Sequence, residues 1–168
     1  MDFMELARAR YSVLDFDTRP IEPEVLEQVL QAGLLAPTAC NFQPQRVLVI
    51  HTERQKQTLA RLTDSALYFD TALLVCYDKK AAWVRPFDGA CSGEIDAAIV
   101  TTHMMLEATA LGLGSIWVMH WDPEKMREAY ALDEDLEPAA LLVLGYPGPK
   151  AEPRPTHLAS KDLADILL

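Results

Sequence analysis

The chain has 168 residues, half of them hydrophobic, and its 25 acidic side chains outnumber 15 Lys and Arg, for a formal net charge of −10. This predicts a single domain over residues 1–168 with a real core, and it disfavours nucleic acid or an anionic membrane as partner, since both attract clustered Lys and Arg. No apolar run is long enough for a membrane span, residues 1–5 lack the features of a signal peptide, and three cysteines form no CxxC pair. We therefore expect a cytoplasmic protein.

Hydrophobic periodicity predicts helices and strands that alternate along the whole chain. Helices are expected over residues 2–11, from Pro23 to the segment 33–37, over 53–63, over 94–112 and from Pro123 onward. Strands are expected over residues 47–51, 73–77, 116–119 and 139–144. The proline-rich segment 147–157 is expected to run extended over the surface.

The segment 94–112 has the strongest helical pattern in the chain. Apolar side chains recur at helical spacing, and several alanines widen the apolar stripe to most of the circumference. At about 1.5 Å per residue, this helix would be roughly 27 Å long. We expect it to be the central helix of the fold.

The loop 36–44 connects the second helix to the first strand and is bounded by two prolines. It carries Thr38, Asn41 and Gln43, which offer hydroxyl and amide groups without charge. Such a loop suits a flat ligand with a polar edge. An ordinary polar connection has the same composition, and the residues alone leave both interpretations open.

Two further segments have features that suit a ligand. Arg10 with Ser12 suits a phosphate, although cations near a helix C-terminus also complement the helix dipole. The long connection 78–92 contains Trp83 and Phe87, which would cover a ring-shaped ligand or pack on a neighbouring subunit. The residues favour neither role for these aromatics.

The sequence contains no Walker loop, no HExxH or GxSxG motif and no Cys/His cluster at metal-ligand spacing. A chain without reactive side chains of its own is typical of a protein whose cofactor carries the chemistry.

In order and spacing, several short motifs resemble the FMN-dependent nitroreductase family over nearly the whole chain. These motifs are Arg10-Tyr11-Ser12, the segment 36–44, Gly112-Leu113-Gly114-Ser115 after the long helix, Leu144-Gly145-Tyr146-Pro147 and the late Lys161. The resemblance implies an α+β fold with a central, mostly antiparallel sheet flanked by helices. It also implies an intertwined homodimer, with two FMN molecules at the interface between the subunits.

The same resemblance assigns a role to each matching position. Cations and hydroxyls would hold the FMN phosphate, and the loop 36–44 of the partner subunit would pack on the flavin ring. A backbone N–H after the third strand would face flavin N5, and no side chain would be catalytic. The implied cofactor-binding positions are Arg10, Tyr11, Ser12, Leu14, Pro37, Thr38, Ala39, Asn41, Gln43, Gly114, Ser115, Met119, His120 and Lys161.

The implied activity is NAD(P)H oxidation with reduction of nitroaromatics, quinones or similar flat acceptors, by ping-pong hydride transfer through flavin N5. Three positions depart from the family pattern and weaken the cation set or the loop. Leu14 and Ser160 stand where relatives carry basic residues, and Gln45 stands where a Trp is common. A non-catalytic FMN-binding protein for storage or sensing, and a related flavin reaction such as reductive dehalogenation, are the alternatives.

Overall fold

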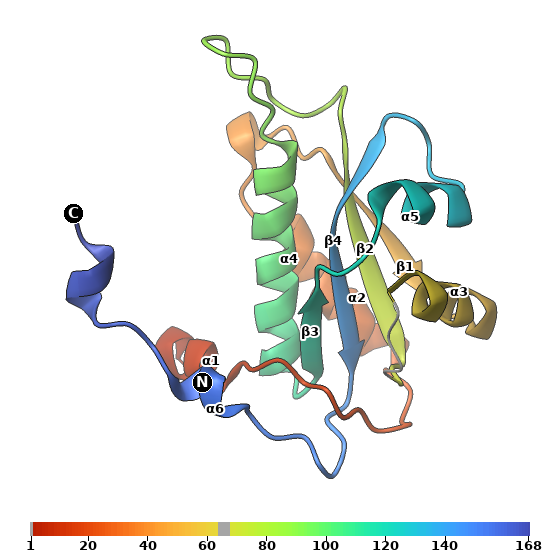
Figure 1. The fold of residues 1–168 in the computed structure, drawn as a ribbon, viewed down its shortest axis with the longest axis vertical. Coiled ribbons are helices and arrows are strands. Elements are labelled where there is room, and N and C mark those ends of the chain that lie inside the picture. Colours follow the sequence, from red (N-terminus) through yellow and green to blue (C-terminus); the bar gives the residue numbers. More distant parts are fainter. Residues whose placement is uncertain (1, 64–67) are drawn as a thin grey trace.

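The computed structural model describes residues 2–63 and 68–168, which fold around a four-stranded sheet (Figure 1). Its strands are β1 (Gln45–Ile50), β2 (Thr71–Asp78), β3 (Gly114–Val118) and β4 (Leu136–Gly145). They lie in the order β1-β2-β4-β3, and every neighbouring pair is antiparallel. The predicted α+β class with a mostly antiparallel sheet is confirmed.

Helices cover both faces of this sheet. The α-helices are α1 (Phe3–Ala9), α2 (Pro23–Leu34), α3 (Glu53–Thr63), α4 (Gly93–Ala110), α5 (Pro123–Ala129) and α6 (Pro155–Leu158). Two short 3₁₀ helices, η1 (Ala39–Asn41) and η2 (Leu163–Ile166), complete the described elements. Helices α2 and α4 pack on one face, and α3 and α5 pack on the other (Figure 1).

The sequence of β2 is an unbroken apolar run because both faces of the strand are buried. Successive side chains of a strand point to opposite faces, so Leu73 and Val75 join the core under α2 and α4. Ala72 and Leu74 join the second core, under α3 and α5. Burial on both faces removes the alternation that a half-exposed strand would show.

Helix α4 is the central helix, as predicted. It has 18 residues, packs against α2 and lies along the sheet. The approach of α2 is close, because a Cβ added to Gly33 would lie 2.8 Å from Met104 Cγ. At about 1.5 Å per residue, α4 separates the features at its two ends by roughly 27 Å.

Of the element boundaries that differ from the prediction, two affect the candidate site. Helix α1 ends at Ala9 rather than at residue 11, because Arg10 has extended backbone angles of φ −65° and ψ 125°. Strand β3 begins at Gly114 rather than at residue 116, since Gly114 and Ser115 pair with β4. Both segments therefore carry extended backbone, which lets them lie side by side.

The connection 78–92 is a turn closed by a bridge between Val84 and Cys91 and by an ion pair of 2.6 Å between Arg85 and Asp88. Phe87 at its tip is 93% exposed, so it covers nothing in its own chain. Its predicted contact with a ligand or a neighbouring subunit stays a prediction. Among the described residues, no helix combines the length and apolar character that a membrane crossing requires.

Candidate functional site

The first group of predicted site residues lies where the extended segment after α1 meets the start of β3, and it comprises Arg10, Ser12, Gly114 and Ser115. Together with Val13, which was not predicted, these residues form what we call the β3 cluster. Ser12 and Ser115 form a parallel bridge, and the Val13 amide donates to the Ser115 carbonyl at 2.9 Å. A Cβ added to Gly114 would lie 2.7 Å from Val13 Cγ2. Glycine at position 114 therefore lets the two backbones approach.

Ser115 gives the β3 cluster a buried polar group that has no hydrogen-bond partner among the described residues. The residue is 2% exposed, and its Oγ has no hydrogen-bond partner among the described residues. A buried hydroxyl in that state costs free energy unless something else satisfies it. Its chemistry fits a ligand that carries phosphate or hydroxyl oxygens.

Arg10 supplies the positive charge of the β3 cluster. Its guanidinium lies 3.5 Å from Nδ1 of His157, which belongs to α6 near the carboxyl end of the chain. The His157 ring also lies beside Tyr11, with the ring centroids 6.3 Å apart. The tail therefore packs against the arginine, which remains half-buried.

The second group lies in the α2–β1 loop, residues 36–44. Three of its non-glycine residues have positive φ angles: Cys40 at 51°, Asn41 at 53° and Gln43 at 51°. Positive φ is strained for such residues and persists only where surrounding contacts impose it. Thr38 provides one contact, because its Oγ1 accepts the Gln43 amide at 3.0 Å.

Asp96 in the first turn of α4 provides the second contact, which the sequence analysis missed. It is 2% exposed, and its Oδ1 accepts the Ala39 amide at 2.9 Å. Its Oδ2 accepts the Ser92 hydroxyl at 2.7 Å. The signal was present, since an acidic residue within the apolar stripe of a helix, four residues after a serine, requires buried partners.

The two groups lie at opposite ends of α4. The α2–β1 loop is bound to the first turn of the helix, whereas the β3 cluster follows its last turn. One chain therefore does not bring Thr38 and Ser12 into a common cleft. A site that uses both needs a second copy, as the resemblance implied.

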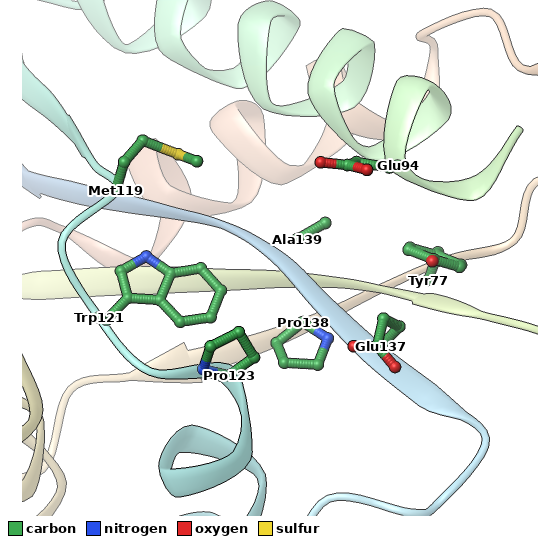
Figure 2. A pocket seen from close by; sticks show the side chains of 8 residues that line it. All are labelled: Tyr77, Glu94, Met119, Trp121, Pro123, Glu137, Pro138 and Ala139. Carbon is green, nitrogen blue, oxygen red and sulfur yellow. The ribbon is translucent and has the colours of Figure 1, made fainter.

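Met119 and His120 lie in the connection between β3 and α5, and both are exposed. This connection borders a pocket of about 330 Å³, shown in Figure 2. Two other predicted positions are exposed as well: Leu14 beside the β3 cluster, and Lys161 in the carboxyl-terminal tail. That tail leaves the body of the molecule after α6 (Figure 1), and Lys161 forms no ion pair or hydrogen bond among the described residues.

Comparison with known proteins identifies the family to which this architecture belongs. The sequence model of the Nitroreductase family matches residues 7–70 and 68–146. A nitroreductase family protein from Clostridium difficile 630 is 41% identical, with a TM-score of 0.94 over 100% of this chain and 98% of that chain.

Two more distant relatives carry informative names. A protein from Exiguobacterium sibiricum 255-15, solved in complex with FMN, is 25% identical, with a TM-score of 0.85 over 99% of this chain and 96% of that chain. An NADH dehydrogenase from Thermus thermophilus is 26% identical over 186 residues, covering 91% of this chain and 90% of its own. By the family match and by the shared fold, the chain belongs to the nitroreductase family.

Proposed function

We propose that the chain is an FMN-dependent NAD(P)H oxidoreductase that reduces nitroaromatics, quinones or similar flat acceptors. The β3 cluster carries this proposal, because the segment of Arg10 and Ser12 pairs there with Ser115, whose buried hydroxyl has no partner among the described residues. That donor and acceptor set fits the phosphate and polyol of FMN. The FMN complex of the Exiguobacterium relative supports it.

At the phosphate end, Arg10 and Ser12 bind the phosphate oxygens, the former by charge and the latter by its hydroxyl. Tyr11 packs on the tail beside them, and Lys161 adds a second cation when its tail is brought to the site. Gly114 and Ser115 offer close backbone and a hydroxyl. Leu14 contributes no charge, which leaves FMN with fewer cations than the family pattern supplies.

At the ring end, the segment Met119–His120 would offer a backbone N–H to the flavin ring. From the partner subunit, Pro37, Thr38 and Ala39 pack on the ring, and the amides of Asn41 and Gln43 support the loop or the ring edge. When bound, FMN supplies hydride transfer at N5, so no side chain has to act as an acid or base. NADH or NADPH would leave before the acceptor enters the same pocket, which would give ping-pong kinetics.

A homodimer completes the site, since the two groups lie about one α4 length apart in a single chain. The outer face of α4 suits such a contact: Ile95 is 66% exposed, and it borders an apolar hollow of about 320 Å³ with Ile99 and His103. Two copies of α4 packed antiparallel through this face bring the loop of one protomer to the β3 cluster of its partner. Such an arrangement gives two equivalent sites.

The test is an anaerobic titration of the purified protein followed by its visible spectrum. We expect a yellow protein whose absorbance bleaches when NADH or NADPH is added and returns when a quinone or nitroaromatic is supplied. A colourless protein that does not take up added FMN would refute the proposal.

One observation favours the second candidate, a flavin-binding protein without turnover. Leu14 is 37% exposed beside the β3 cluster and supplies no charge there, and fewer cations around FMN would leave its anionic reduced form less stabilised. Bound FMN that stays oxidised with both nicotinamides under anaerobic conditions would support this candidate instead of the oxidoreductase.

A further inference from the structure

The pocket beside Met119 has aromatic and proline walls and an acidic rim. Its volume is about 330 Å³, which is enough for a single ring system. Figure 2 shows Trp121 and Tyr77 on opposite sides, with Glu94 reaching in from the first turn of α4. The lining residues are Tyr77, Glu94, Met119, Trp121, Pro123, Glu137, Pro138 and Ala139.

The two aromatic rings of this pocket are held in place. The indole nitrogen of Trp121 donates to the Val118 carbonyl at 2.9 Å, which fixes the ring and leaves its π faces free of that bond. Tyr77 lies over the start of α4, where a Cβ on Gly93 would come within 2.1 Å of its Cδ2. Rings fixed before binding lose little entropy when a flat ligand stacks on them.

The charges around the pocket leave one carboxylate unbalanced. Glu137 is paired with Arg127 at 2.9 Å and with Lys79 at 3.7 Å. Glu94 has neither an ion pair nor a side-chain hydrogen bond among the described residues. Burial raises the pKa of Tyr77, and Cys91, Glu137 and Glu94 raise it further, so the negative field reaches the pocket wall.

We propose that this pocket binds a flat aromatic cation, with Trp121 and Tyr77 stacking on the ligand and Glu94 as its counter-charge. The inference rests on the proposed function, because Met119 belongs both to the pocket and to the segment proposed to face flavin N5. Acceptors with a positively charged substituent are then preferred over neutral ones, and anionic acceptors are disfavoured. Ring faces attract cations, and an unpaired carboxylate adds to that attraction.

The test measures binding to the oxidised, FMN-loaded protein without a reductant, by equilibrium dialysis at low salt. The probes are (4-nitrobenzyl)trimethylammonium, neutral 4-nitrobenzyl alcohol and anionic 4-nitrobenzoate. We expect the cation to bind about tenfold more tightly than the alcohol, and the benzoate to bind more weakly than either. Equal affinities for the cation and the alcohol would overturn the inference.

Variants assign the preference to named groups. Glu94→Gln keeps the shape of the side chain and removes its charge, so the preference for the cation should fall to about twofold. Glu24→Gln, in the first turn of α2, is the matched control and should keep the tenfold preference. An unchanged preference in Glu94→Gln would overturn the role of that carboxylate, and Trp121→Leu should weaken cation binding through loss of the ring face.

The same titration on FMN-free protein separates this inference from the proposed function. Cation preference in a protein that never binds FMN would support the pocket and refute the flavin role. A protein that binds FMN and is bleached by NAD(P)H, yet treats cation and alcohol alike, would refute the pocket and leave the flavin role intact. Reduction of the three nitro probes should follow the same order in kcat/KM.

Discussion

The β3 cluster and the α2–β1 loop are predicted to meet on one cofactor, yet they are built in different ways. The β3 cluster is fixed by backbone pairing, with Ser12 bridged to Ser115 and the Val13 amide bonded at 2.9 Å to the Ser115 carbonyl. The loop is fixed by side-chain oxygens, from Thr38 within it and from Asp96 on α4.

This difference predicts different weaknesses. A region held by backbone pairing tolerates changes of polar side chains and responds to added volume, because its packing is close. A strained loop held by a few oxygens responds to the loss of any one of them. The predictions below probe these weaknesses, beginning with the largest expected effect.

Gly114→Ala should have the largest effect and act on the β3 cluster. The new Cβ would lie 2.7 Å from Val13 Cγ2 and 3.0 Å from Val13 Cβ, so the two extended segments must separate. We expect a loss of about 2–3 kcal/mol in the free energy of unfolding, measured with urea. FMN binding should weaken as well, followed by fluorescence titration.

Val13→Ala is the control for that substitution. Alone it should destabilise the protein by leaving a small cavity, but combined with Gly114→Ala it should restore part of the lost stability, because the clashing methyls are gone. Additive losses in the double variant would show that steric conflict at position 114 is not the cause.

Asp96→Ala should have the next largest effect and act on the loop. The Ala39 amide and the Ser92 hydroxyl would lose their buried acceptor, which costs about 2 kcal/mol. Asp96→Asn keeps an oxygen for the amide, so it should lose roughly half as much. If the two variants lose equal stability, the Ala39 hydrogen bond is not what holds the loop.

A variant that loosens the α2–β1 loop should also change the bound flavin, and not only the stability of the protein. In Asp96→Ala, FMN affinity and the flavin visible spectrum should change even where the protein is fully folded, since the loop is proposed to pack on the ring. Ser92→Ala removes one of the two partners of Asp96 and serves as a milder control. A flavin spectrum unchanged in both variants would remove the loop from the site.

Arg10→Gln should change binding and leave stability nearly intact. The substitution removes the charge that faces the phosphate, and we expect about tenfold weaker FMN binding, or about 1.4 kcal/mol. Added salt should narrow the gap between the variant and the original protein. Arg8→Gln, on the exposed side of α1, is the matched control and should bind FMN normally.

The smallest expected effect concerns the hydrogen-bonded pair Tyr146 and Glu22, which joins the end of β4 to the start of α2. Tyr146 donates a hydrogen bond of 2.5 Å to Glu22, and that bond lowers the pKa of the Glu22 carboxyl, with the Glu22 backbone adding to the shift. A lowered folded-state pKa stabilises the protein above the carboxyl's unfolded pKa, and this is lost as the pH falls through the folded value.

The midpoint of thermal unfolding should therefore drop on acidification from about pH 6 to about pH 3, slightly more in the original protein than in Glu22→Gln. Because the pair is exposed, the difference should be small, and it should shrink further in Tyr146→Phe, where only the Glu22 backbone and Arg19 still lower the pKa of the carboxyl. If the midpoint of thermal unfolding dropped more in Glu22→Gln than in the original protein, the pair would not have this stabilising role.

Most of the fold could be predicted from the sequence, because helical periodicity and the apolar runs of the strands are both clear. The apolar stripe of α4 predicted a central helix, and the apolar runs of β2 and β4 predicted strands, both of which are buried in the sheet. Capping side chains fix the starts of two of these helices: Thr52 and Gln55 exchange hydrogen bonds before α3, and the Asp122 side chain caps α5.

Boundaries near the candidate site were harder to predict. Helix α1 stops at Ala9 because the segment after it pairs with β3, where Ser12 bridges Ser115. Strand β3 starts at Gly114 because that residue pairs with Gly145 of β4. Asp96 was missed for the same reason: its partner Ala39 lies 57 residues earlier, and only the packing of α4 against the α2–β1 loop brings them together.

The sequence by itself determined the class of fold, the central helix and the family, because local periodicity and the order of short motifs are properties of the chain alone. Tertiary structure decided that the two halves of the proposed site lie at opposite ends of α4, so that a site using both requires a second protomer. It also decided that Glu94 faces Trp121 and Tyr77 across one pocket. Such distances depend on long-range packing, and no local pattern encodes them.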